Sequence, residues 1–199
     1  MDTAAMDSVA EVVATGAATK PLAMIEEALQ QRGWEREQLE GIAVGLGPGS
    51  YNGLRVAIAL AQGWELGRAV KVMGIGTVNC LAAQATEEGL GGLIHIVIDA
   101  QRNEFYVASY EVGGSEPRMI EGLRLASLAE AQARAESGGI VLGPEVTKWF
   151  PNGRVMFPRA ATAARLGSKG PFVAAESLAP IYLRATSFVK APPPRIFPP

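Results

Sequence analysis

Cysteine and histidine are almost missing from this sequence. Cys80 is its one cysteine and His95 its one histidine, in a chain of 199 residues. A lone cysteine forms no disulfide within the chain, and the pair falls short of the four ligands of an ordinary structural zinc site. We therefore expect a small buried Cys80 on a helix, a structural His95 and no bound metal.

Long apolar runs and an excess of charge of one sign are also missing. A run such as Val56–Ala61 is far shorter than the roughly 18 residues that span a bilayer. The N-terminus shows no basic segment followed by an apolar core, and the net charge is −2 with scattered Lys and Arg. These features predict a cytoplasmic protein without a membrane anchor, in which any contact with RNA belongs to a partner.

The second half of the sequence predicts three antiparallel strands followed by alternating helices and strands. Residues 93–99 and 104–112 alternate in polarity around a turn, which is typical of a hairpin. The remaining predicted elements are a strand at 118–125, a helix at 128–136 capped by Ser127, a strand at 140–142, a short helix at 145–150, a strand at 155–157 and a helix at 160–166. This order is typical of a ribonuclease-H-like lobe, a mixed sheet covered by helices.

The first half repeats this order, but the three antiparallel strands at its beginning are shortened. The predicted elements are a helix that ends at Gly33, a strand at 41–45, a helix at 50–66 stopped by Gly67, a strand at 70–75 and a helix from its cap Thr77 to about Glu88. Ahead of them only residues 8–13 have strand character.

We therefore predict an α/β protein with two ribonuclease-H-like lobes of the actin, sugar kinase and heat-shock ATPase type. The N-terminal lobe takes residues 1–91, with an incomplete antiparallel front, and the C-terminal lobe takes residues 92–190. Residues 191–199 form a proline-rich tail.

The stretch GLGPGSYNGLR at residues 45–55 forms the corner between a strand and a helix. Gly47, Gly49 and Ser50 could hold an anion or a nucleotide phosphate at the helix N-terminus. Neither the Walker A spacing nor G-x-G-x-x-G matches, and a tight packing turn is the other interpretation.

The helix after the corner is apolar around nearly its whole circumference. Between Leu54 and Ala61 only Arg55 is polar, whereas a helix on one sheet needs only an apolar stripe. Its second face requires a cover, either from both lobes of this chain or from helices of another protein. Arg55 and Gln62 would lie at the margin of such a contact.

Four segments in order resemble the TsaB (YeaZ) family. Residues 45–67, GLGPGSYNGLRVAIALAQGWELG, are similar to the family's G-R-G-P-G-S-F-T-G-x-R motif and the Ala/Gly-rich helix ending in K/Q-G-L-A. Residues 72–78, 98–106 and 180–184 resemble its V-x-G-V-S-S-L, D-A-R-R-G-E-V-Y and P-x-Y-L-R segments. Leu46 replaces the usual Arg and Asn52 the usual Thr, so one positive charge is lost near the corner.

The resemblance implies a pseudo-enzymatic subunit with no catalytic residues of its own. Such a subunit pairs with the catalytic paralogue TsaD and, with the ATPase TsaE, supports transfer of a threonylcarbamoyl group to adenosine 37 of tRNAs that read ANN codons. ATP or ADP and the tRNA would then be bound in the complex. The residues expected to contact TsaD are Leu22, Ile25, Leu29, Ser50, Leu54, Arg55, Ile58, Ala59 and Gln62. A homodimer through the same helices is compatible with this interpretation.

Two other functions are alternatives to the pseudo-enzymatic subunit. An ATPase or small-molecule kinase of the same superfamily would turn over ATP, but the N-terminal phosphate-binding hairpin of such enzymes is what this sequence most lacks. The sequence contains no recognisable set of catalytic residues for a peptidase. Asp99 and Glu104 are interpreted as solvated carboxylates beside a turn. The apolar residues that usually begin the family's first strand are missing here. We therefore expect a truncated N-terminus, in a fragment or a divergent form.

Overall fold

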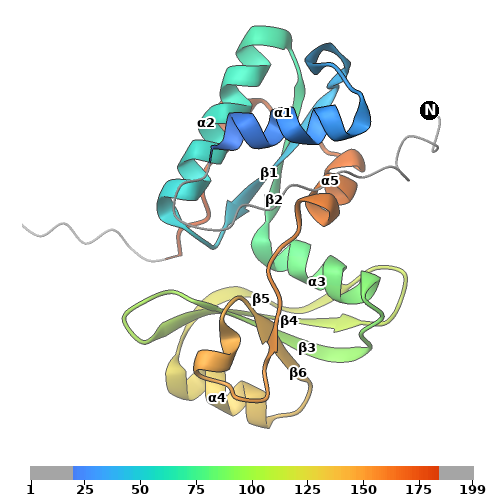
Figure 1. The fold of residues 1–199 in the computed structure, drawn as a ribbon. Coiled ribbons are helices and arrows are strands. Elements are labelled where there is room, and N and C mark those ends of the chain that lie inside the picture. Colours follow the sequence, from blue (N-terminus) through green and yellow to red (C-terminus); the bar gives the residue numbers. More distant parts are fainter. Residues whose placement is uncertain (1–19, 184–199) are drawn as a thin grey trace, which may run out of the picture.

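The computed structural model describes residues 20–183 of the chain, which form two sheets with helices around them (Figure 1). The predicted strand at 8–13 and the tail at 191–199 lie outside the described residues. The mixed α/β architecture confirms the predicted fold class.

The upper part of the molecule in Figure 1 holds a two-stranded parallel sheet. Its elements are α1 (Pro21–Arg32), the 3₁₀ turn η2 (Arg36–Gln38), β1 (Gly41–Gly47), α2 (Tyr51–Arg68) and β2 (Lys71–Gly76). As predicted, α1 ends at Gly33, whose φ of 65° is left-handed. The predicted stop of α2 at Gly67 is wrong by two residues, because the helix runs to Arg68 and its cap is Ala69. The left-handed residue is Ala69, because the chain turns there to enter the sheet at the buried Val70.

The lower part is a five-stranded mixed sheet in the order β5-β4-β3-β6-β7. Its strands are β3 (Gly92–Asp99), β4 (Glu104–Val112), β5 (Arg118–Ser127), β6 (Ile140–Gly143) and β7 (Arg154–Val155). The first three pair antiparallel, whereas β6 runs parallel to β3 and β7 parallel to β6. This confirms the predicted hairpin and third strand. The helix predicted at 145–150 is reduced to one 3₁₀ turn, η3 (Val146–Lys148).

Helices cover both faces of the lower sheet. Along β3, Ile94 and Ile96 pack with Leu81 of α3 (Thr77–Glu87), while Val97 packs on the opposite face in a cluster that includes Ala131 of α4 (Leu128–Glu136). The predicted cap of α4 is confirmed, since Ser127 and Glu130 form a capping box. The predicted cap of α3 is wrong: Gly76 occupies the N-cap and Thr77 is the first helical residue.

The last described segment crosses back to the upper sheet. Helix α5 (Ala160–Ser168) packs on β1 and β2, and the 3₁₀ turn η4 (Ala175–Ser177) packs against α2. Gly167 permits this approach, because a Cβ there would lie 2.6 Å from the Cβ of Ala43. Residues 160–183 therefore lie in space with the N-terminal lobe, although the sequence-based division placed them in the lobe of residues 92–190.

Among the described residues, no helix combines the length and the apolar character that crossing a membrane would require.

Candidate partner interface

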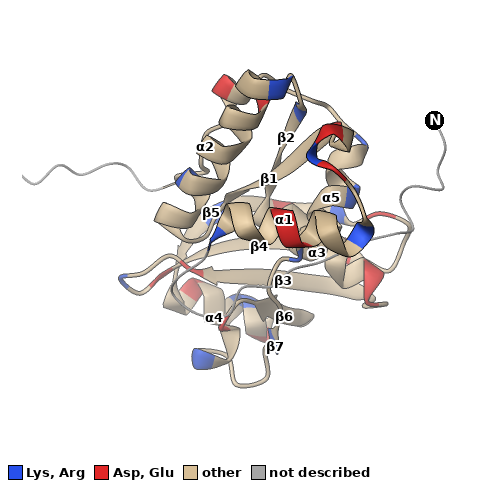
Figure 2. Cartoon of the chain, turned by 45° about the horizontal axis from the view of Figure 1, so that its top comes forward, with Lys and Arg blue, Asp and Glu red and all other residues tan. Residues whose placement is uncertain are grey.

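Helix α2 is covered on one apolar side and open on another. Ile58 and Ala61 are buried, and both belong to the cluster formed with the upper sheet. Val56, Ala59 and Leu66 are exposed, and Leu66 keeps 88% of its surface accessible. In Figure 2 the charged residues of α2 lie toward the two ends of the helix. The prediction that this helix is apolar on more sides than its own sheet covers is therefore confirmed.

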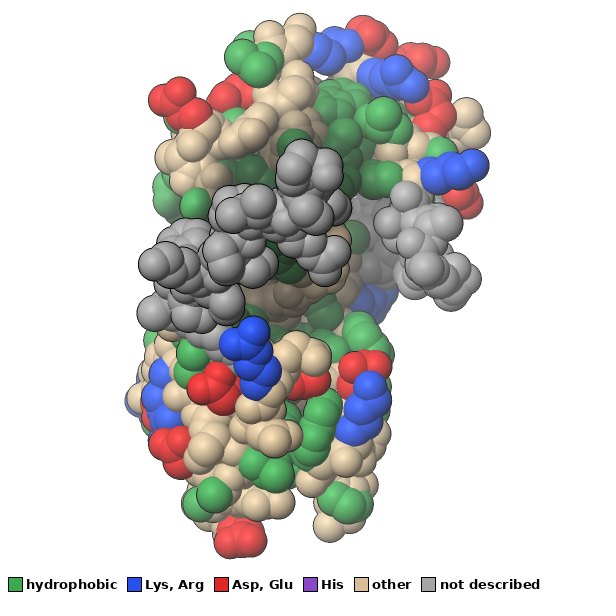
Figure 3. Space-filling view, turned by 90° about the vertical axis from the view of Figure 1, so that its left-hand side faces the viewer, with side chains coloured by type: hydrophobic (Ala, Val, Ile, Leu, Met, Phe, Trp, Pro, Cys, Tyr) green, Lys and Arg blue, Asp and Glu red, His purple; other side chains and the backbone are tan. Residues whose placement is uncertain are grey.

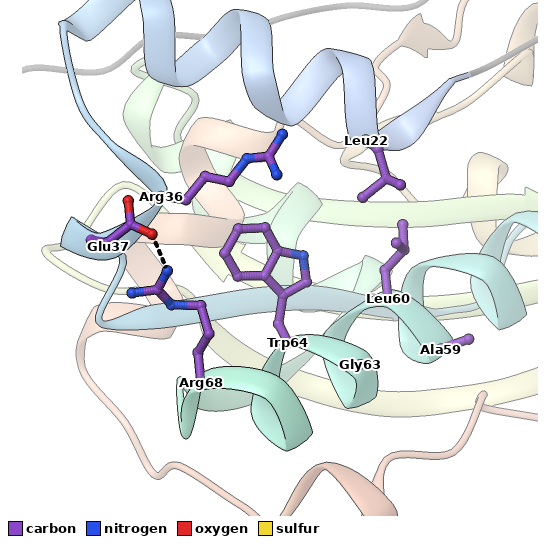
Figure 4. Close-up of a pocket in the computed structure, with 8 residues that line it drawn as sticks. All are labelled: Leu22, Arg36, Glu37, Ala59, Leu60, Gly63, Trp64 and Arg68. Carbon is purple, nitrogen blue, oxygen red and sulfur yellow. Dashed lines mark hydrogen bonds and ion pairs between the residues drawn. The ribbon is translucent and has the colours of Figure 1, made fainter.

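A groove runs between α1 and the open side of α2. We call it the α1–α2 groove; its volume is about 450 Å³, and its lining residues are Leu22, Arg36, Glu37, Ala59, Leu60, Gly63, Trp64 and Arg68. Leu22 comes from α1, is 60% exposed and points toward Leu60 of α2 (Figure 4). Ala59 and Gly63 line the groove and are both exposed, so small residues form part of its floor. A partner helix could therefore approach the backbone of α2 closely.

Charged side chains close one end of the groove. Arg68 donates from Nη1 to Oε1 of Glu37 at 2.6 Å, and this bond holds the pKa of the Glu37 carboxyl below its usual value. Arg36 is paired with Glu26 of α1. Figure 3 shows hydrophobic side chains in a hollow of the upper part, with charged side chains near its edge. An apolar floor with a charged rim is the usual anatomy of a protein–protein interface.

Some of the residues predicted to contact a partner do lie on accessible surface. Leu22 and Ala59 line the groove. Ile25 on α1 is half-buried. Ser50 and Arg55 are exposed near the start of α2, where the Arg55 guanidinium lies 4.1 Å from the centre of the Tyr51 ring.

Four other predicted contact residues point inward. Leu29 and Ile58 are buried in the chain's own core. Gln62 donates from Nε2 to the carbonyl of Ala175 in η4, and Leu54 packs against the corner at Gly47. The sequence shows that α2 is apolar all round, but it does not show which side its own sheet takes.

Sequence reasoning missed most of the residues that line the groove. These are Leu60, Gly63, Trp64 and Arg68 of α2, with Arg36 and Glu37 of η2. A signal for part of the α2 set was present, because Gly63 follows Ala59 and Trp64 follows Leu60 at a spacing of four residues. The η2 residues carried no such pattern, since a 3₁₀ turn of three residues has no apolar period.

The corner before α2 works mainly as a tight turn. Gly47 has a φ of 93°, and a Cβ there would meet Leu54 Cδ1 at 2.7 Å, so only glycine fits. Ser50 Oγ accepts the N–H of Gly53 at 3.3 Å and caps α2.

The corner also borders a second cavity, between the two sheets. This cavity of about 550 Å³ is lined by Gly49 and Ser50 together with Asp99 and Glu145. Among the described residues that line it, none is a lysine or an arginine that could neutralise a phosphate. The anion or nucleotide site at Gly47, Gly49 and Ser50 stays a prediction.

His95 is a buried structural residue on β3. Its Nε2 lies 2.9 Å from the carbonyl of Gly138, which makes Nε2 the donor, and its Nδ1 lies 2.8 Å from Ser109 Oγ, whose hydroxyl it accepts. Burial lowers the pKa of His95, so the ring is neutral at pH 7. Among residues 20–183, no three His, Cys, Asp or Glu side chains gather in a way that could hold a metal ion.

The two carboxylates predicted at the hairpin turn differ in their surroundings. Asp99 accepts from both the main-chain N–H and the side-chain amide of Gln101, so it stabilises the turn. Glu104 begins β4 and is half-buried.

Comparisons with known proteins identify relatives of this chain. The family model described as TsaD: tRNA N6-adenosine threonylcarbamoyltransferase matches residues 11–189. The tRNA threonylcarbamoyladenosine biosynthesis protein TsaB of Escherichia coli (strain K12) is 28% identical over 181 residues, which cover 82% of this chain and 78% of that protein. The protein of the same name from Bacillus subtilis (strain 168) is 26% identical over 166 residues, covering 74% of this chain and 71% of that protein. The solved structure of YeaZ from Pseudomonas aeruginosa has a TM-score of 0.68 at 24% identity and covers 81% of this chain and 82% of that one. The match over residues 11–189 shows that this chain belongs to the family which that model describes, and the curated relatives support its assignment to the TsaB (YeaZ) proteins.

Proposed function

We propose that this chain is the non-catalytic subunit of a tRNA threonylcarbamoyladenosine system, and that it docks a TsaD-like catalytic paralogue through the α1–α2 groove. The names of its relatives support the pathway. In this proposal the threonylcarbamoyl transfer to adenosine 37, the tRNA and any ATP or ADP belong to the complex, in which a TsaE-like ATPase also takes part.

The observation that carries the proposal is the open apolar side of α2. Fully burying one exposed Leu or Val side chain stabilises a complex by about 1.5–3 kcal/mol. Leu22, Val56 and Leu66 together could therefore offset a substantial part of the estimated 4–15 kcal/mol lost on association. The rim supports this interpretation, since its charges are paired within the chain and need no partner charge.

The match to the transferase model supports the choice of partner. The match over residues 11–189 supports a fold shared with the transferase. The apolar, small-residue surface of α2 suits close packing against a helix of such a partner.

Substitution of one floor residue tests the proposal. We expect Ala59→Glu to weaken binding to the TsaD-like paralogue from the same genome by about a hundredfold or more, because it buries an unpaired charge in the contact. Ala133→Glu is the matched control, since Ala133 is equally an exposed helical alanine but lies on α4 of the other lobe. Calorimetric titration of the separately purified paralogue with each of the two variants gives both dissociation constants. Wild-type affinity of the Ala59→Glu protein would exclude the groove as the docking site.

The isolated chain also tests the alternative function. Steady ATP turnover by this chain without its partner would favour an ATPase or kinase of the same fold. Ile58→Glu is unsuitable for either test, because Ile58 is 6% exposed and the change would disrupt the core.

A further inference from the structure

Trp64 forms one wall of the α1–α2 groove and carries a free hydrogen-bond donor. Its indole stands between α2 and Arg36, and its nitrogen faces the side on which Leu22 and Leu60 stand (Figure 4). No described residue accepts a hydrogen bond from this N–H. The residue is half-buried, so the donor is solvated in the free chain and would lose water when the groove is covered.

The other side chains of the groove are apolar or belong to ion pairs within the chain. Leu22, Ala59 and Leu60 carry no polar side-chain atoms. At the rim, Arg36 is paired with Glu26, and Arg68 with Glu37. The indole N–H is therefore a donor beside the apolar part of the groove that has no acceptor among the described residues.

We propose that Trp64 determines which partner this groove accepts, and that the partner brings an uncharged oxygen acceptor, a main-chain carbonyl or an amide or hydroxyl oxygen, to the indole N–H. The inference rests on the proposed function and specifies the chemistry of that docking site. A wholly aliphatic helix face would cover the groove but leave the N–H desolvated and unpaired, so it would bind less tightly. A carboxylate acceptor is disfavoured because Arg36 and Arg68 are already paired with Glu26 and Glu37, so a partner carboxylate buried at the indole would lose its hydration without gaining a free counter-charge.

Trp64 is a further departure from the family motif, beside Leu46 and Asn52. The family's helix ends in K/Q-G-L-A, whereas this chain reads Gln62-Gly63-Trp64-Glu65. Leucine has no donor, so a partner matched to leucine at this place need not supply an acceptor.

The test is the Trp64→Phe protein, which keeps an aromatic wall and removes the N–H. We expect it to bind the TsaD-like paralogue roughly threefold to tenfold more weakly than wild type, the range for one net hydrogen bond. In the ¹⁵N-labelled wild-type chain, the indole N–H signal of Trp64 should shift downfield and become protected from solvent exchange when the partner is added. The indole of Trp149 is the internal control, because it packs edge-on against Phe105 in the other lobe.

The outcomes separate this inference from the proposed function. Unchanged affinity of Trp64→Phe and an unshifted indole signal, with Ala59→Glu still disrupting the complex, would overturn the role of Trp64 and leave the docking site intact. Normal binding by Ala59→Glu would overturn the docking site itself. Thermal unfolding of Trp64→Phe at the wild-type temperature shows that the variant is folded, and Trp64→Leu should bind no better than Trp64→Phe.

Discussion

At the scale of single residues, His95 shows how burial decides the role of an ionisable group. Its ring bridges β3 to Gly138, just beyond α4, and to Ser109 on β4. Arg134 donates to the same Ser109 hydroxyl, so a second positive charge beside the ring would be unfavourable. Removal from water is the main cause of the lowered pKa, and the nearby Arg134 adds to it.

The lowered pKa of His95 predicts a loss of stability in mild acid. Below about pH 6.5, the pKa of His95 in the unfolded chain, the unfolded state binds a proton that the folded state does not. The free energy of unfolding should therefore be constant above that pH, fall as the pH drops, and level off below the folded pKa. Urea unfolding between pH 8 and pH 5 measures this slope, and the His95→Gln protein should lack it.

Two glycines provide a matched pair of substitutions. A Cβ on Gly143 would lie 2.0 Å from the main-chain oxygen of Val97, whereas a Cβ on Gly67 in α2 meets nothing within 4 Å. We expect Gly143→Ala to destabilise the chain by about 2–3 kcal/mol, because backbone must move. Gly67→Ala should stabilise it by about 0.5–1 kcal/mol through helix propensity. Equal melting temperatures of the two proteins would contradict this account.

At the scale of elements, α2 is fixed by polar side chains on its inner side. Gln62 Nε2 donates to the carbonyl of Ala175, and the Glu65 carboxylate accepts the main-chain N–H of the same residue. These bonds hold η4 against α2, and the last described segment thereby supports the helix whose other side stays open. Gln62 therefore has an internal role in this structure, and its predicted contact with a partner stays a prediction.

Substitution of Gln62 should separate stability from docking. We expect Gln62→Ala to lower the free energy of unfolding by about 1 kcal/mol, since it removes one hydrogen bond to a main-chain carbonyl. Its affinity for the TsaD-like paralogue should stay within twofold of wild type, whereas Ala59→Glu should show the reverse pattern. Urea unfolding and calorimetry on both proteins make the comparison, and a large loss of affinity in Gln62→Ala would return this residue to the interface.

At the scale of the whole molecule, the two sheets are joined by α3 and by ion pairs. Arg165 of α5 contacts Glu87 of α3, and Lys169 pairs with Glu116 between β4 and β5. The first bond also lowers the pKa of Glu87. Both pairs connect the returning segment to parts of the chain far away in sequence, so the lobes are linked by more than one connection.

The open groove predicts that self-association and partner binding compete. At high concentration the isolated chain should form a dimer through α1 and α2, since an uncovered apolar surface can pair with its own copy. Adding the TsaD-like paralogue should convert this dimer into a one-to-one complex, and Leu22→Glu should abolish both. Light scattering after size-exclusion chromatography gives the masses. A complex that retains two copies of this chain would show that the surfaces differ.

The order of most elements could be read from the sequence because it depends on local patterns. Alternating residues in β3 and β4, the Ser127 cap of α4 and the end of α1 at Gly33 each act within a few residues. The apolar circumference of α2 was equally readable, and it indicated that a second face of the helix needs a cover, either from this chain or from another protein.

Tertiary structure alone decided where those patterns meet. The sequence by itself determined the strands, the helices and the excess of apolar surface on α2, since these follow from the spacing of residues along the chain. It did not determine that α5 returns to the upper sheet, that Ile58 faces inward while Ala59 faces the groove, or that Trp64 and Arg36 share one cavity. Such choices depend on which distant surfaces fit together, because burial is set by neighbours that lie far apart in the sequence.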